Sequence, residues 1–256
     1  MADALPIGQI VQGNLLEVLP AWPAECVDLI FADPPFNIGY KYDRYRDDLP
    51  PEKYMAWTER WIEACLRVLK PGGTFWIAIG DEYAAEVRVA MRRRATLRNW
   101  VVWHYTFGQN CKGKFNRSHA HLFYFVKDPK RFTFNTDAVR IRSDRQLKYN
   151  DKRANPKGKL PDDVWTFSRV CGTFKERVGW HPCQMPLALL ERIVLACSKS
   201  GDVVLDPFAG SGTTLLAASR HGRRWVGVEL SRRYAARAAK RIAAALPATA
   251  ERSPAP

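Results

Sequence analysis

Short segments of nearly continuous apolar residues alternate with helical segments along most of the chain, and this alternation restricts the fold more than any other feature. VDLIFA (27–32), TFWIAI (74–79) and VVL (203–205) are typical of strands that are buried on both faces of a parallel sheet. The helices expected around these strands span 51–69, 81–95, 185–198 and 231–246. Strands that alternate with helices predict a doubly wound α/β sheet, in which ligands bind at the carboxyl ends of the strands.

The composition supports one large globular domain in a reducing compartment. Of the 256 residues, 46% are hydrophobic, which is enough for a substantial core, and no run of 18 apolar residues is present. The six cysteines are scattered without a C-x-x-C pair, which argues against a metal site and against a disulfide framework. The first residues lack a basic-then-apolar leader, so we expect a soluble, cytoplasmic protein without a membrane segment.

The charge is strongly positive, with 40 Lys and Arg against 26 Asp and Glu and a formal net charge of +14. One interpretation is the arginine preference of a high-GC genome. The other is a polyanionic partner, of which nucleic acid is the commonest. Charge alone does not separate these two interpretations, so the choice depends on the motifs.

A glycine-rich turn, DPFAGSGTT (206–214), lies between a predicted strand and a predicted helix. Gly210 and Gly212 allow the backbone to approach a ligand closely, and the amino end of a helix favours electron-rich groups. The segment lacks the lysine of a P-loop and the third glycine of a dinucleotide fingerprint. Glu229 ends the next strand, 17 residues after Gly212, where an acid typically holds ribose hydroxyls. The pattern favours a nucleoside cofactor without a pyrophosphate over an ordinary tight turn.

The second motif, DPPF, follows the first apolar strand. Asp33 offers two acceptor oxygens, the two prolines have no backbone N–H to donate, and Phe36 supplies a flat apolar face. This combination matches a planar heterocycle with an exocyclic NH₂ group. Accepting hydrogen bonds from this NH₂ group would direct the nitrogen lone pair at an electrophile. A sulfonium methyl group beside an aromatic ring would be a suitable electrophile. A proline-rich turn that merely ends a strand is the structural alternative.

Three motifs together resemble the amino-methylating DNA methyltransferases that use S-adenosylmethionine. The catalytic [DNS]-P-P-[YFW] motif is matched by Asp33 to Phe36, and the cofactor motif D-P-F-x-G-S-G-T-T by Asp206 to Thr214. HPCQMP, from His181 to Pro186, is similar to H-P-[TA]-Q-K-P, with Cys183 and Met185 in place of the commoner residues. The catalytic motif precedes the cofactor motif, which resembles the beta group of this family.

The resemblance implies a Rossmann-like, doubly wound methyltransferase fold that is circularly permuted and carries an inserted target-recognition region. In that arrangement the first strand of the chain would be the third strand of the sheet. The parts expected are a catalytic half (1–129), the inserted region (130–178), a cofactor-binding half of the same domain (179–246) and a disordered tail (247–256).

The resemblance also assigns roles to residues, with S-adenosyl-L-methionine as the cofactor and no metal. The catalytic residues implied are Asp33, Pro34, Pro35 and Phe36. The cofactor-binding residues implied are Asn14, Asp33, His181, Gln184, Pro186, Asp206, Phe208, Gly210, Ser211, Gly212, Thr213, Thr214, Glu229 and Leu230. Asn14 takes the place of an acid that the family usually directs at the cofactor's adenine.

Double-stranded DNA is the partner that the resemblance implies, with the target base flipped out of the duplex. Residues 130–177 carry thirteen Lys and Arg against six Asp and Glu, interleaved with aromatics, and a basic loop at 108–118 is a second candidate surface. The DNA-binding residues expected are Lys112, Lys114, Arg117, Arg140, Arg142, Arg145 and Lys148. A merely solvated loop region is the alternative for 130–177.

Within the family, the aspartate form of the catalytic motif goes mostly with adenine, so adenine N6 is favoured over cytosine N4. A methyltransferase acting on RNA or on a protein amide is a rival hypothesis, and an inactive DNA-binding relative is a second one. The recognition sequence, a cognate restriction endonuclease and a homodimer stay open at this point.

Overall fold

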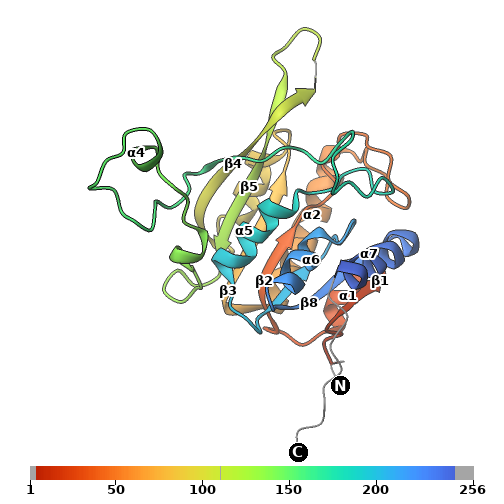
Figure 1. Cartoon of the computed structure of the whole chain (residues 1–256). Coiled ribbons are helices and arrows are strands. Elements are labelled where there is room, and N and C mark those ends of the chain that lie inside the picture. Colours follow the sequence, from red (N-terminus) through yellow and green to blue (C-terminus); the bar gives the residue numbers. More distant parts are fainter. Residues whose placement is uncertain (1–3, 110, 246–256) are drawn as a thin grey trace, which may run out of the picture.

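Strands from both ends of the chain meet in one mixed sheet in the computed structural model, which describes residues 4–109 and 111–245 (Figure 1). The strands are β1 (Gln9–Gln12), β2 (Val27–Ala32), β3 (Leu69–Ile79), β4 (Thr96–Gln109), β5 (Arg117–Val126), β6 (Val164–Thr166), β7 (Val203–Asp206) and β8 (Arg224–Glu229). They are ordered β1-β8-β7-β2-β3-β5-β4-β6. All neighbouring pairs are parallel except those of β5, which runs antiparallel to β3 and β4.

Helices cover both faces of this sheet (Figure 1). They are α1 (Leu15–Ala21), α2 (Pro51–Val68), α3 (Ala84–Met91), the 3₁₀ helix η1 (Thr136–Val139), α4 (Asp144–Leu147), α5 (Leu187–Cys197), α6 (Thr213–Arg220) and α7 (Arg232–Ala245). None of the helices in the described part of the chain has both the length and the apolar character needed to cross a membrane.

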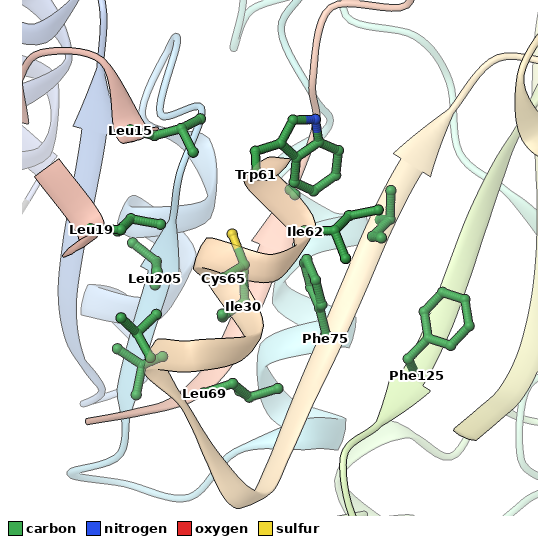
Figure 2. Close-up of a cluster of buried hydrophobic side chains, with 14 of the residues drawn as sticks. Leu15, Leu19, Ile30, Trp61, Ile62, Cys65, Leu69, Phe75, Phe125 and Leu205 are labelled. Carbon is green, nitrogen blue, oxygen red and sulfur yellow. The ribbon is translucent and has the colours of Figure 1, made fainter. Parts of the chain in front are cut away.

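The apolar run of β2 is continuous from Leu29 to Ala32 because helices bury both faces of this strand. Ile30 and Ala32 pack in a cluster with α1, α2 and α3, whereas Leu29 and Phe31 pack in a cluster with α5 and α6. Figure 2 shows Ile30 in the first cluster, beside Cys65 of α2. Alternate side chains of one strand therefore fill two cores, and β2 is held from both sides.

The parallel pairing brings the two sequence motifs to one edge of the sheet. Strand β7 pairs with β2 on one side and with β8 on the other. Because these strands are parallel, their carboxyl ends meet at the same edge. The residues that follow or end them, Asp33, Asp206 and Glu229, consequently lie on neighbouring strands.

Several sequence expectations for the secondary structure were wrong in detail. Helix α2 ends at Val68, one residue short of the 51–69 expected, and KPGG (70–73) lies inside β3, where the register with β2 shifts between Val27 and Leu29. Helix α3 is shorter than the 81–95 expected. The region 130–178 contributes β6, a strand that was not expected from the sequence; it pairs with β4 and brings Trp165 into the core on the α5 face. The expected disordered tail lies outside the described residues.

The double burial of β2 predicts a large cost for truncating the helix side chains that cover it. Ile62 on α2 is fully buried, so Ile62→Ala should lower the free energy of unfolding by about 2–5 kcal/mol through lost apolar contact and a residual cavity. Chemical denaturation measures this difference. Val89→Ala on α3, where the side chain is 68% exposed, is the control and should change stability by less than about 0.5 kcal/mol. Equal effects of the two variants would contradict the packing described.

Candidate active site

A cavity of about 260 Å³ lies at the carboxyl ends of β2, β7 and β8. Its wall includes residues 13–15 at the start of α1, residues 42–45, Trp57 of α2, and the side chains of His181, Cys183 and Met185. These segments are far apart in sequence, and only the sheet brings them together. The cavity is therefore the candidate site that the sequence placed at this edge.

Most of the residues to which the sequence assigned a catalytic or cofactor-binding role line this cavity. They are Asn14, Asp33, Pro35, His181, Asp206, Phe208, Gly210, Ser211, Thr213, Thr214, Glu229 and Leu230. The assigned residues outside its lining are Pro34, Phe36, Gln184, Pro186 and Gly212. Asn14 has a second role there, because its side-chain oxygen caps α1 by accepting a hydrogen bond from Leu16 N at 3.1 Å.

Three carboxyl groups at the cavity have raised pKa values. Burial raises the pKa of Asp33 to about 8, and the charge of nearby Asp206 contributes to this rise. Burial raises the pKa of Asp206 to about 7, although Phe208 N donates to it at 3.0 Å. Burial also raises the pKa of Glu229, against hydrogen bonds from Gly210 N and Ser231 N at 2.8 Å each. A positive group in the cavity would favour the ionised form of all three.

The lining as a whole is acidic, although the protein is strongly basic. Among the described residues it contains Asp33, Asp43, Asp206 and Glu229, with Arg44 as its one Lys or Arg residue. The imidazole of His181 adds little charge, since burial lowers its pKa to about 4. A cavity of this kind suits a ligand that carries positive charge next to apolar parts, which the rings of Trp57 and Phe208 would contact.

The two glycines of the turn have different functions. Gly210 lines the cavity with φ +47°, and a Cβ there would lie 2.9 Å from Nε2 of His181. Gly212 has φ +76° and does not line the cavity; a Cβ there would lie 3.1 Å from Cβ of Ala238 on α7. Only Gly210 thus provides the expected close approach to the cavity, whereas Gly212 permits the packing of α6 against α7.

The residues of the catalytic motif also differ in whether they reach the cavity. The Asp33 carboxyl reaches the cavity and accepts no hydrogen bond from the described residues. Tyr54 OH donates to the carbonyl of Pro35 at 2.8 Å, so that acceptor is already engaged. Phe36 packs beside Gly80, where a Cβ would lie 3.2 Å from its ring, and not in the cavity wall. In this conformation the expected stacking face of Phe36 is therefore turned toward the core.

The segment from His181 to Pro186 lines the cavity through His181, which was assigned a role, and through Cys183 and Met185, which were not. The Gln184 side chain receives a hydrogen bond from Val178 N at 2.9 Å and donates to the Glu176 carbonyl at 2.8 Å. It thereby fixes the end of the 130–178 region to the start of α5. Cys183 and Met185, the two departures from the family pattern, both line the cavity.

A loop over residues 37–49 covers part of the cavity, and the sequence reasoning missed it. The buried carboxylate of Asp47 accepts hydrogen bonds from Asn37 N at 2.7 Å and Tyr40 N at 2.9 Å, which closes the loop on itself. Its tip reaches both sides of the cavity: Tyr42 OH donates to Sγ of Cys183 at 3.7 Å, and Ser231 Oγ donates to Asp43. The run of tyrosines at 40, 42 and 45 was the sequence signal that could have revealed it.

The residues expected to bind DNA fall into two distant groups, near α4 and on the β4–β5 hairpin (Figure 1). Four of them are engaged within the protein: Arg117 with Asp81 and Glu82, Arg140 with Asp137, Arg145 with Asp151, and Lys148 with Asp144. Lys112, Lys114 and Arg142 are exposed, and no ion pair holds them within the described residues. These three are the ones available to a polyanion without breaking an internal pair.

The matches to known proteins agree with this geometry. The family model for DNA methylases matches residues 27–241. The chain is 35% identical over 236 residues to the type II methyltransferase M.HpaI of Haemophilus parainfluenzae, covering 91% of this chain and 74% of that protein. It is 38% identical over 233 residues to the DNA adenine methyltransferase YhdJ of Escherichia coli K12, covering 88% of this chain and 79% of that protein.

Solved structures show the same fold. TTHA0409 of Thermus thermophilus, assigned as a DNA modification methylase and solved with S-adenosyl-L-methionine, superposes with a TM-score of 0.66 at 27% identity, over 93% of this chain and 94% of that one. The cytosine-N4-specific PvuII DNA methyltransferase superposes with a TM-score of 0.69 at 19% identity, over 94% of this chain and 92% of that one. At that identity the second match supports the fold alone.

The raised pKa of Asp33 predicts how stability depends on pH. The folded protein keeps a proton on this carboxyl up to a pH of about 8, whereas the unfolded chain loses it near its ordinary pKa. This group therefore makes the protein less stable as the pH rises from about 4 to 8. Asp33→Asn cannot ionise, so its unfolding free energy relative to the native protein should increase between about pH 5 and pH 8.5 in urea denaturation. A difference that stays constant with pH would contradict the burial of this charge.

Proposed function

Because this chain belongs to the family of N6/N4 DNA methylases, we propose that it transfers a methyl group from S-adenosyl-L-methionine to adenine N6 in double-stranded DNA. The observation that supports this most is the position of Asp33, whose half-buried carboxyl faces an acidic cavity and has no hydrogen-bond partner among the described residues. The family itself follows from the match over residues 27–241 and from the two relatives above 30% identity.

The cavity fits the charge and the shape of S-adenosyl-L-methionine. This cofactor carries a sulfonium and an ammonium group, and the four acidic residues of the lining favour such positive charges. Glu229 keeps unused lone pairs beside its two backbone donors and can accept from ribose hydroxyls. Trp57 and Phe208 offer apolar faces. The complex of TTHA0409 with the same cofactor supports this assignment.

When bound, the cofactor supplies an electrophilic methyl group on its sulfonium sulfur. The residues of the protein hold the target amine in line with that methyl group. We assign the two amine hydrogens to the carboxylate of Asp33 and to the carbonyl of Pro34, since the Pro35 carbonyl already accepts from Tyr54. Hydrogen bonds from both N–H groups to these acceptors keep the nitrogen lone pair out of conjugation and directed at the methyl carbon. Asp33 also stabilises the positive charge that develops on the amine.

Adenine is the base that we propose, with cytosine N4 as the second candidate. The aspartate in the catalytic motif and the 38% identity to a DNA adenine methyltransferase both favour adenine. A ribonucleic acid, a protein amide and an inactive relative are less consistent with the DNA methylase match and the intact motifs.

We further propose that the fold is circularly permuted. The order of the strands, with β1 at the sheet edge beside β8, supports this arrangement. Residues 130–178 would read the DNA sequence, between a catalytic half (1–129) and a cofactor-binding half (179–246). We propose action in the cytoplasm, with a cognate restriction endonuclease and a homodimer as partners still to be sought.

Sequencing of genomic DNA with detection of modified bases tests the reaction in cells that express the chain. We expect N6-methyladenine in one short sequence motif, at nearly every copy, and none in cells that express Asp33→Ala. N4-methylcytosine in place of N6-methyladenine would contradict the choice of base. No modified base in DNA at all would contradict the proposed function.

Substitutions at Asp33 and Glu229 should separate methyl transfer from cofactor binding. Asp33→Ala should lower kcat by about 10²–10³, because one preorganised acceptor is lost, and should raise the Kd of S-adenosyl-L-methionine less than Glu229→Ala does. Glu229→Ala is the reciprocal control and should raise that Kd about tenfold or more, since it removes charge-assisted hydrogen bonds. Calorimetry and steady-state kinetics measure the two effects. An Asp33→Ala variant with activity within a few fold of the native protein would refute the assignment.

A further inference from the structure

We propose that Phe115 is a wedge that enters the DNA helix beside the flipped base and fills the space that this base leaves. The proposal rests on the proposed function, because it requires a duplex substrate. Phe115 is a large aromatic residue whose side chain is 99% exposed, at the tip of the hairpin formed by β4 and β5. Lys112 and Lys114 precede it in the same tip and are also exposed.

The hairpin projects from the edge of the sheet that carries the active site (Figure 1). The last residue of β3, Ile79, pairs with His121, whereas β5 begins four residues earlier at Arg117. At about 3.4 Å per residue, the paired part of this hairpin, here called the arm, extends roughly 14 Å beyond the end of β3. The major groove of DNA is about 8.5 Å deep and admits a two-stranded ribbon. The arm is thus long enough for its tip to reach the base pairs of a duplex bound at the cavity.

The base of the arm is fixed relative to the catalytic motif. Arg117 forms ion pairs with Asp81, at 3.1 Å, and with Glu82, both of which follow β3. Gly80, directly before them, lies against Phe36 of the catalytic motif. The tip is closed as well, because Cys111 N donates to Oδ1 of Asn116 at 3.0 Å. A duplex that engages the tip is consequently held in a defined position relative to the catalytic motif.

The tip of the hairpin combines an exposed aromatic ring with two positive charges, which suits insertion into DNA. A single exposed apolar residue needs no special explanation, but Phe115 is preceded by two cations on an arm that buries almost none of its ring. Phosphates attract the two lysines, and a ring inserted between base pairs recovers stacking that flipping removes. Proteins that bind the minor groove insert Phe and similar residues between base steps, so a duplex accepts an inserted aromatic ring. Phe115 would act as a positioning residue, since it stabilises the flipped state without contacting the reacting atoms.

Methylation of two duplexes tests this role, both carrying the sequence found by modification sequencing. In one the target base is paired normally, and in the other it lies opposite an abasic site, where flipping costs little. We expect Phe115→Ala to lower kcat/KM at least about fivefold on the paired duplex, the fold-change that loss of one stacking contact implies. The same variant should act on the abasic duplex within about twofold of the native protein. Phe115→Trp should retain activity on both.

Two controls make the outcome specific. Val89→Ala, an exposed substitution on α3, should leave both rates unchanged, and the thermal midpoint of Phe115→Ala should equal that of the native protein. A Phe115→Ala rate equal to the native rate on the paired duplex would overturn the proposal, as would an equal loss on both duplexes, which indicates a phosphate or subunit contact. If the native protein methylates neither duplex, the proposed function fails first, and this proposal fails with it.

Discussion

Three carboxyl groups converge where parallel strands β2, β7 and β8 end, and the rest of the active-site edge depends on this convergence. The sheet forces it, because neighbouring parallel strands end at one edge and each strand ends in, or next to, an acid. Burial raises the pKa of Asp33, Asp206 and Glu229, so the cavity holds acids that a cation would stabilise in their ionised form. The preference for a cationic cofactor is therefore built into the fold before any ligand binds.

The parts of the fold and site that the sequence predicted share one property: each is specified by a short contiguous segment. Strand β2 is apolar on both faces because helices cover both, and this pattern is visible in six residues. The turn from Asp206 to Thr214 and the acid at Glu229 likewise follow strands that can be recognised locally. Many of the residues to which a resemblance built on such segments gave a role in the site line the cavity.

The parts that the sequence could not predict depend on residues brought together only by the fold. The function of Gly212 depends on Ala238 of α7, and β6 is defined by pairing with β4 rather than by its own three residues. The loop over 37–49 is stabilised by Asp47, whose carboxylate closes it through backbone donors that no pattern marks. Similarly, several arginines that looked available to DNA are engaged by acids nearby in space, such as Arg117 by Asp81.

We propose that an acidic cavity and Asp33 together direct a sulfonium methyl group onto the N6 amine of adenine. The most direct test incubates the purified protein with duplex DNA and S-adenosyl-L-methionine labelled in its methyl group, and then separates the nucleosides after nuclease digestion. We expect the label in N6-methyl-deoxyadenosine and none in a matching RNA. Label in the RNA, in the protein itself or in N4-methyl-deoxycytidine alone would contradict this mechanism.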